Sequence, residues 1–461
     1  MLNNANNQNS ARQNIPAESA GSMVWRIYLP KRYILAILTN IGFILSFGMR
    51  INLCTFTFDS AHLSLIRNYS KLYFMIAYFL IQIPTAILVN RFSPFKIFGL
   101  SILCNALLEL GTLIIIYTCH AYWLYYLGFF RGLFEGAAFP AAHGMWQHWV
   151  PSKERSTLIS IAYSGCFFGI AIGAHFSYLA CGLLPEDKVV IVYGVLGILW
   201  FVLWTWSIYE NPSAHPTITQ AELQYLNQEI KNCESTNNGS NPIPWKEVFC
   251  SKSVWALYVI HFCRAFTSMD VLLGDFSTSK IIVYQSTINV ELPPAIFVAM
   301  TLLAVGFLAD LISMKTSKSV FYIRRSYISG CLFIELLIYL PGVLFSINSF
   351  GLVFIDEILN CLSYSFLICG IFVNHADVAP KYAHITMAIS QMMNVLSSFL
   401  IYCIPFEYEE VLEGYEFNKM EAYSILDALF NIIGGLIYNA WGSGQVEVWS
   451  KSEPEVNISV I

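Results

Sequence analysis

The stretch YENPSAHPTITQAELQYLNQEIKNCESTNNGSNPIPWKEV, residues 209–248, is the long polar segment that decides how this chain is organised. Its Pro, Asn and Ser clusters surround one short amphipathic run, a composition typical of an exposed linker. Long apolar runs lie on both sides of it. Because about 20 apolar residues are needed to cross the hydrocarbon core of a bilayer, these runs predict membrane-spanning helices. We expect residues 209–252 to link two groups of such helices.

The apolar runs account for most of the chain. Of its 461 residues, 56% are hydrophobic and only 12% are charged, whereas a soluble domain carries about 25% charged residues. The twelve cysteines form no CxxC pair and no metal-ligand rhythm, so they indicate core residues rather than disulfides or a metal site. A net charge of −5 without a basic tract argues against nucleic acid as a partner. The expected spans are 33–57, 71–90, 96–118, 122–143, 157–182, 189–208, 253–275, 291–311, 326–346, 350–373, 385–405 and 422–441.

Basic residues indicate which side of the membrane each loop faces. They cluster before the first span, after the second and after the eighth, on the same side as both termini and the linker in a twelve-span topology. The positive-inside rule makes that side cytosolic. We expect a disordered cytosolic tail at 1–32, bundles at 33–208 and 253–441, a cytosolic linker at 209–252 and a cytosolic tail at 442–461. Two six-helix halves predict an all-α polytopic membrane protein with the major facilitator fold, whose substrate site lies between the halves.

Three arginines lie inside stretches that otherwise suit lipid. A cationic side chain at the bilayer centre costs roughly 2.5–3.5 kcal/mol on insertion scales, so it normally faces a partner or a polar cavity. Arg50 and Arg264 have no acid three or four residues away, and a bound carboxylate would offer each guanidinium two parallel hydrogen bonds. The pattern predicts a cavity that receives negative charge. The stretches are GFILSFGMRINLCTFTF (42–58), YYLGFFRGLFEGAAF (125–139) and ALYVIHFCRAFTSM (256–269).

The third arginine, Arg131, lies four residues before Glu135 on the same helix face. One interpretation is a structural ion pair in which neither side chain touches substrate. The other gives Arg131 a part in substrate binding and Glu135 a part in proton coupling. A carboxyl balanced between burial and a nearby arginine can change its protonation as access alternates. Both interpretations stay open at this point.

Four stretches are more specific than apolar character explains: RYILAILTNIGFILSFGMRINL (32–53), PAAHGMWQHWVPSKERS (140–156), YENPSAHPTI (209–218) and GIFVNHADVAPKYA (370–383). They resemble the vesicular glutamate transporters, within the family that also holds sialin and the sodium-phosphate cotransporters. The likeness runs from about Arg32 to Trp449. It implies a proton- and potential-linked transporter of organic anions, above all L-glutamate, with sodium-coupled phosphate transport as a second mode. We expect a monomer in the lipid bilayer of a synaptic or other vesicle, with protons, sodium and chloride as candidate coupling ions and no cofactor.

The resemblance also implies roles for individual residues. Substrate-binding positions correspond to Arg50, Arg264 and Tyr78, and the proton-coupling position corresponds to Glu135. The tenth-span signature places His375 and Asp377 in a helix-end network or a gate, and Glu335 matches a ninth-span glutamate. Apart from the resemblance, other polar residues in the spans are expected to cap helices or to form interhelical hydrogen bonds: Asp310, Glu109 and His143.

Several positions depart from the family pattern. Gly128 stands where the family has its fourth-span arginine, Lys71 where it has a histidine and Met269 where it has an aromatic residue, and the loop expected at about 58–70 is short. Arg131 could cover for the missing arginine. The departures keep two alternatives open: a sialin-like or sodium-phosphate symporter of the plasma membrane, and a transport-dead homologue acting as an anion sensor or chloride conductance. No nucleophile–base set indicates an enzyme. Asn68 begins a glycosylation sequon in the short loop.

Overall fold

The computed structural model describes residues 29–54, 61–118, 123–182, 186–230, 242–265, 292–316, 318–345, 350–403 and 419–451. Nearly all of these residues are helical, and each of the twelve expected spans contains a helix. The fourth span, expected as one helix, forms two that are interrupted at Ala137. The helices of the first half are α1 (Lys31–Cys54), α2 (Ala61–Arg91), α3 (Pro94–Thr118), α4 (Trp123–Gly136), α5 (Ala138–Trp149), α6 (Arg155–Gly182) and α7 (Glu186–Ser207).

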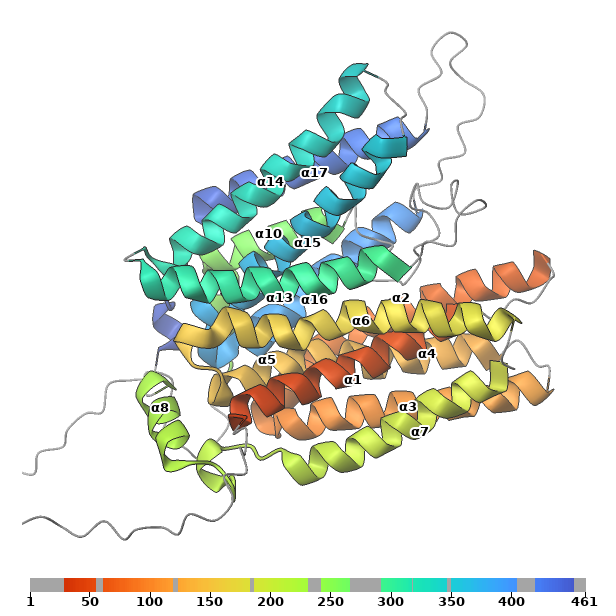
Figure 1. Cartoon of the computed structure of the whole chain (residues 1–461), viewed down its shortest axis with the longest axis horizontal. Coiled ribbons are helices and arrows are strands. Elements are labelled where there is room, and N and C mark those ends of the chain that lie inside the picture. Colours follow the sequence, from red (N-terminus) through yellow and green to blue (C-terminus); the bar gives the residue numbers. More distant parts are fainter. Residues whose placement is uncertain are drawn as a thin grey trace, which may run out of the picture.

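The second half repeats this helical architecture after the linker (Figure 1). Among the described residues of both halves, seven helices are long enough and apolar enough to cross a membrane. The fold is therefore that of an all-α polytopic membrane protein, as predicted. The linker forms α8 (Gln220–Ile230) and α9 (Trp245–Cys250), and the second half contains α10 (Lys252–Ala265), α13 (Leu292–Lys315), α14 (Val320–Phe345), α15 (Phe350–Val378), α16 (Ala383–Cys403) and α17 (Lys419–Trp441).

Small residues allow α1 and α6 to pack closely. Gly165, Gly169 and Gly173 recur every four residues on α6 and therefore lie on one helix face. A Cβ atom at Gly165 would lie 2.2 Å from the Asn40 carbonyl oxygen, and one at Gly169 would lie 2.6 Å from that of Ile44. Neighbouring transmembrane helices use such small-residue faces to bring their backbones together. This close contact, which we call the α1–α6 seam, joins α1 to the rest of the first half.

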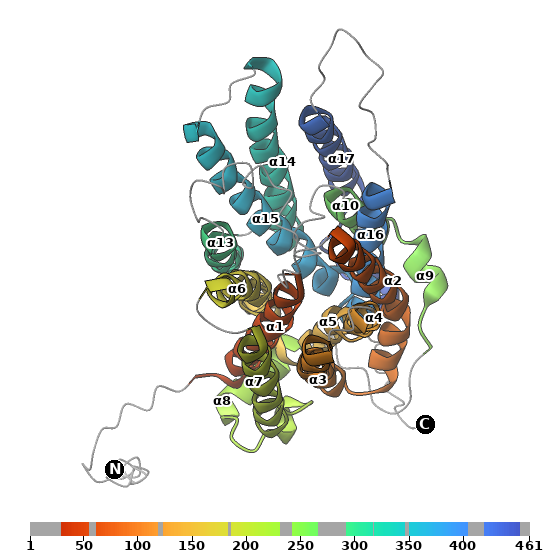
Figure 2. The same cartoon turned by 90° about the vertical axis from the view of Figure 1, so that its right-hand side faces the viewer.

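The two halves lie side by side, with α1–α7 in one group and α10–α17 in the other (Figure 2). Helix α6 packs against α13, and α2 packs against α16, so these two pairs join the halves. The end of the bundle that carries α8 also holds the start of α1 and the linker (Figure 1). We call it the α8 end.

The linker was expected to be exposed, and this is wrong for one face of α8. Leu226 is 1% exposed and Glu222 is 5% exposed, so the inner face of α8 is buried. Glu222 accepts hydrogen bonds from the backbone and guanidinium of Arg32, and Arg32 also pairs with Glu154 at 2.7 Å. Lys153 pairs with Glu229 at 2.7 Å. Helix α8 is therefore docked on the first half rather than free.

The loop expected at about 58–70 is also wrong in part, because residues from Ala61 onward belong to α2. Ser70 is buried and donates a hydrogen bond to the Leu124 carbonyl. The sequon of Asn68 therefore lies in the first turns of a helix rather than in a loop. Its glycosylation stays a prediction.

Candidate anion site between the two halves

A cavity of about 120 Å³ lies between the halves, lined by α1, α5 and α6 on one side and α10, α15 and α16 on the other. Its described lining includes one formally charged side chain, Arg264, together with polar groups of His261, Gln391 and Asn394. The wall is otherwise apolar and strongly aromatic. Concave, mostly apolar sites with a few convergent polar groups are typical of small-ligand binding. The aromatic lining residues are Phe47, Phe139, Tyr163, Phe167, Tyr364 and Phe372.

Arg264 reaches this cavity from the end of α10 and pairs with Glu335 of α14. The Glu335 carboxylate also accepts a hydrogen bond from Ser363 at 2.8 Å. The guanidinium carbon of Arg264 lies 5.4 Å from the centre of the Tyr364 ring, within the range of a cation–π contact. Arg264 is thus held at the cavity wall by an acid from another helix. That acid was not visible as a neighbour in the sequence.

Arg50 lies one aromatic ring behind the cavity wall. It pairs with Glu135 of α4, and its guanidinium carbon lies 4.1 Å from the ring centre of Phe47 and 5.3 Å from that of Phe74. Phe47 lines the cavity, whereas Arg50 is absent from the described lining. The predicted convergence of the arginines on one cavity is therefore not seen in the described lining: Arg264 lines the cavity, and Arg50 lies in the layer behind.

Arg131 and Glu135 do not form the ion pair that their spacing suggested. Arg131 instead pairs with Glu109 of α3 and donates a hydrogen bond to the Met49 carbonyl at 2.8 Å. Glu109 was expected to serve in packing or interhelical hydrogen bonding, and it is instead the ion-pair partner of Arg131. The Met49 carbonyl adjoins Arg50, so α1 connects the two ion pairs of the first half.

Gly128 occupies a position with no room for a side chain. A Cβ atom there would lie 2.5 Å from the backbone oxygen of Ser70. The missing family arginine is thus replaced by a close contact between α4 and α2. Tyr78 is fully buried in a cluster with Phe74 and Val395 rather than at the described cavity wall. Met269 lies outside the described residues.

The sequence carries the signature of a recognised fold family. A family model described as Major Facilitator Superfamily matches residues 72–402. The chain belongs to the major facilitator superfamily. The solved structures that it resembles include a bacterial homologue of the iron transporter ferroportin in its outward-facing state, with a TM-score of 0.60 at 11% identity, covering 89% of this chain and 98% of that one. Another is the transporter FucP in its outward conformation, with a TM-score of 0.54 at 13% identity, covering 89% and 100%. These likenesses show the fold.

Curated relatives are closer in sequence. The probable vesicular glutamate transporter eat-4 of Caenorhabditis elegans is 28% identical over 451 residues, covering 92% of this chain and 76% of the relative. Vesicular glutamate transporter 2 of Homo sapiens is 27% identical over 458 residues, with the same two shares. Within the superfamily, this chain is therefore a divergent sequence that is similar to the vesicular glutamate transporters.

A major facilitator protein opens alternately at its two ends, and an ionic network joins the halves at the α8 end. Asp377 pairs with Arg155 at 2.7 Å and with Arg324 at 2.8 Å. Asp310 accepts hydrogen bonds from the backbone N–H groups of Ser156 and Thr157, at 3.1 and 2.7 Å, and so caps the start of α6. Arg324 also donates to the Ser156 hydroxyl at 2.8 Å. Asp310 and Asp377, which were expected to act at helix ends, therefore also bond the second half to α6 of the first half.

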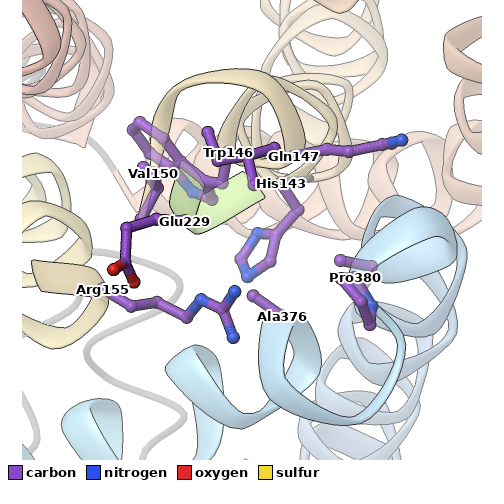
Figure 3. Close-up of a pocket in the computed structure, with 10 residues that line it drawn as sticks. His143, Trp146, Gln147, Val150, Arg155, Glu229, Ala376 and Pro380 are labelled. Atoms are coloured by element: carbon purple, nitrogen blue, oxygen red, sulfur yellow. The ribbon is translucent and has the colours of Figure 1, made fainter. Parts of the chain in front are cut away.

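Beside this network, a pocket of about 10 Å³ is lined by residues of both halves and of α8. Figure 3 shows the His143 ring and the Arg155 guanidinium directed into the same space near Ala376. This volume corresponds to about one water molecule. The two halves and α8 are therefore in close contact at the α8 end.

His261 was missed as a site residue. It lies three residues before Arg264 on the same face of α10, and this spacing could have identified it. Its Nε2 atom lies 3.2 Å from Nε2 of His375. His143, expected to serve in packing or hydrogen bonding, is buried and bonds across the halves to the Phe372 carbonyl at 3.2 Å. The structure thus gathers three histidines between the cavity and the α8 end.

Proposed function

We propose that this chain is an alternating-access transporter of organic anions and that L-glutamate is its first candidate substrate. The observation that carries the proposal is Arg264, the charged side chain in the described wall of an aromatic cavity between the halves. A carboxylate is the natural partner of a guanidinium, because two parallel N–H···O bonds can form. The similarity to vesicular glutamate transporters supports the choice of glutamate.

The size of the cavity supports a small substrate. A water molecule needs about 10–15 Å³ of such volume, so about 120 Å³ accommodates roughly ten atoms of that size. L-Glutamate has about ten non-hydrogen atoms. A substrate carboxylate would share Arg264 with Glu335, and the surrounding rings would exclude water from the bond. The low dielectric would strengthen the contact.

The driving force in this proposal is the membrane potential of a vesicle that is positive and acidic inside, with the α8 end facing the cytosol. Moving one elementary charge through 100 mV is worth about 2.3 kcal/mol, which corresponds to a concentration ratio of about 50-fold. The pH difference would add to this driving force if a proton moves opposite to the anion, and would oppose it if the two move together. Sodium-coupled phosphate transport is the second mode that the experiment must include.

The test is transport by purified protein in liposomes. Labelled L-glutamate and inorganic phosphate are offered first under an imposed potential and then under a sodium gradient. Potential-driven glutamate uptake would support the proposal, and sodium-dependent phosphate uptake would support the plasma-membrane alternative. Anion binding or chloride current without any substrate uptake would support the transport-dead alternative and refute the proposal.

Site variants make the test specific. Arg264→Gln should reduce uptake by at least tenfold, but it also leaves Glu335 without its arginine. The double variant Arg264→Gln/Glu335→Gln removes both charges and should regain stability while uptake stays low. Arg325, which bonds Asn439 on the exposed face of α14, supplies a matched control, since Arg325→Gln should transport normally. Normal uptake by the double variant would rule out Arg264 as the anion ligand.

A further inference from the structure

Three histidines form a buried cluster between the central cavity and the α8 end. His261 of α10 is 3% exposed, and His375 of α15 and His143 of α5 are 0% exposed. The ring centres of His261 and His375 lie 5.3 Å apart, and those of His143 and His375 lie 5.9 Å apart. His261 also lines the cavity beside Arg264. The cluster therefore begins at the anion site and ends at the interface between the halves.

The partners of His261 and His375 define where their protons lie. Thr386 donates its hydroxyl proton to the Ala383 carbonyl at 3.1 Å, so its oxygen accepts from Nδ1 of His375 at 3.0 Å. A neutral His375 then has an unprotonated Nε2, which accepts the Nε2–H of His261 at 3.2 Å. The two neutral rings share one proton across this contact. Nδ1 of His261 is left as the nitrogen that can take another proton.

A suitable acceptor for that added proton stands beside the same ring. The Asn394 side chain contacts His261, and its Nδ2 group donates to Gln391 at 2.9 Å. Its carbonyl oxygen can therefore accept a hydrogen bond from a protonated Nδ1 of His261. Asn394, Gln391 and His261 all line the cavity. A proton can thus be received at the cavity wall beside a side chain that is able to accept its hydrogen bond.

The intramembrane carboxylates are less suited to this task. Glu135, Glu109 and Glu335 are each paired with an arginine, namely Arg50, Arg131 and Arg264. Protonating one of them would leave its arginine as an uncompensated buried charge, and breaking a buried ion pair in this way typically costs about 3–5 kcal/mol. A proton added to the histidine pair breaks no ion pair in the described structure.

The pair is also attached to the interface between the halves. Phe372 lies one turn before His375 on α15, and its carbonyl accepts the Nε2–H of His143 from the first half. The other ring nitrogen of His143, Nδ1, lies 2.7 Å from the Tyr163 hydroxyl oxygen and 3.3 Å from the Phe139 carbonyl oxygen, and Tyr163 lines the cavity. A positive charge on the pair would therefore act on a bond that holds the halves together. The titratable and charged groups on the helices around the pair are Arg264, Glu335, His143, Tyr163, Arg155, Arg324, Asp377, His384 and Tyr438.

We propose that the hydrogen-bonded pair His261–His375 is the site that binds the coupling proton, in place of Glu135. The proposal rests on the transport function proposed above. A proton from the cavity adds to Nδ1 of His261, forming one N–H bond and placing a positive charge next to Arg264. The charge favours the anion in the cavity, and the anion in turn favours the bound proton. When the anion leaves, the same N–H bond breaks and the proton returns to water.

The experiment separates coupling from binding in proteoliposomes at zero membrane potential, with labelled L-glutamate as the probe. Two assays are run on each protein: accumulation driven by an imposed pH difference of either polarity, and exchange of internal for external glutamate without a gradient. Wild type should perform both. His261→Gln and His375→Gln should each lose at least tenfold of the pH-driven accumulation. His375→Gln, whose residue is absent from the described cavity lining, should keep exchange within about threefold of wild type. His215→Gln, a histidine in the linker, is the matched control and should behave as wild type.

A second readout follows the proton directly, with a pH indicator trapped inside the liposomes. Glutamate entry should change the internal pH in wild type and not in the two variants. Full proton coupling in either variant, or equal loss of exchange and accumulation in folded His375→Gln, would overturn the assignment. Wild-type exchange that ignores every pH gradient would overturn it while leaving the transport function standing. If wild type exchanges no anion, both the proton assignment and the proposed transport function are overturned.

Discussion

The ionic network around Asp377 should set how often the α8 end opens. In Asp377→Asn, the bonds to Arg155 and Arg324 lose their negative partner while both arginines keep their charges. The Arg324 and Asp377 side chains are 4% and 5% exposed, and that of Arg155 is 15% exposed. Breaking a buried pair by removing one partner typically costs 3–5 kcal/mol. Because Arg155 retains some water, we take the lower figure, about 3 kcal/mol.

That energy applies to the closed α8 end, since the arginines regain water when the halves separate there. At 1.4 kcal/mol for each factor of ten, about 3 kcal/mol shifts the closed-to-open ratio by roughly 100-fold. A protein that is 99% closed would then populate both forms about equally. The change should be visible as a second population rather than as a small displacement.

Electron paramagnetic resonance distance measurements in nanodiscs provide the assay. Spin labels at the exposed positions Phe92, after α2, and Thr316, after α13, report the separation of the two halves at the α8 end. Wild type should give one short distance, and Asp377→Asn should add a longer one. Asp187→Asn is the control, because Asp187 bonds the exposed Tyr117 hydroxyl at the start of α7. An unchanged distance distribution in a folded Asp377→Asn protein would refute the closed-end role of the network.

Three further predictions concern other parts of the molecule. Gly165→Ala should destabilise the protein by about 1–3 kcal/mol through the clash with the Asn40 carbonyl, whereas Gly111→Ala, with nothing within 4 Å, should be neutral or stabilising by up to about 1 kcal/mol; thermal unfolding in detergent measures both, and equal melting temperatures would contradict the seam. Glu109→Gln should lower the free energy of unfolding by about 3–5 kcal/mol, and the double variant Arg131→Gln/Glu109→Gln should recover most of that loss. The exchange variant Arg131→Glu/Glu135→Arg should not keep wild-type stability; wild-type stability in that variant would favour the pairing within α4. Burial and nearby Lys31 lower the pKa of His215 from its ordinary value of 6.5. Docking of α8 should therefore be complete above about pH 6.5 and should weaken as the pH falls below that value. A spin label at the exposed position Gln228 should then gain mobility at low pH in wild type and not in His215→Phe.

The spans were predictable because apolar length is a property of consecutive residues. The end of α17 at residue 441 agrees with the predicted boundary, and the end of α7 at residue 207 lies within one residue of it. The fourth span was predicted as one helix, and its interruption at Ala137 was not foreseen. No hydropathy signal distinguishes a break between two apolar turns, because both sides of the break are equally apolar.

The ion pairs could not be predicted, for a physical reason. A search at three and four residues finds only partners on the same helix, and it offered Glu135 to Arg131. In the structure each arginine takes an acid from another helix, as Arg264 does with Glu335. Helix rotation and neighbour choice decide such pairs, and the sequence of one span contains neither. The substrate-binding and proton-coupling roles of these residues stay predictions.

The pairing of Arg50 with Glu135 has a consequence for how the protein is made. The two residues are 85 positions apart in the chain, so the first helix leaves the ribosome well before its acidic partner exists. At about 5–20 residues per second of synthesis, this interval lasts roughly 4–17 s. During that time the guanidinium lacks Glu135 as its partner, and we expect it to stay near water at the insertion channel or the bilayer surface. Release of the first helix into lipid should therefore wait until the fourth has been synthesised.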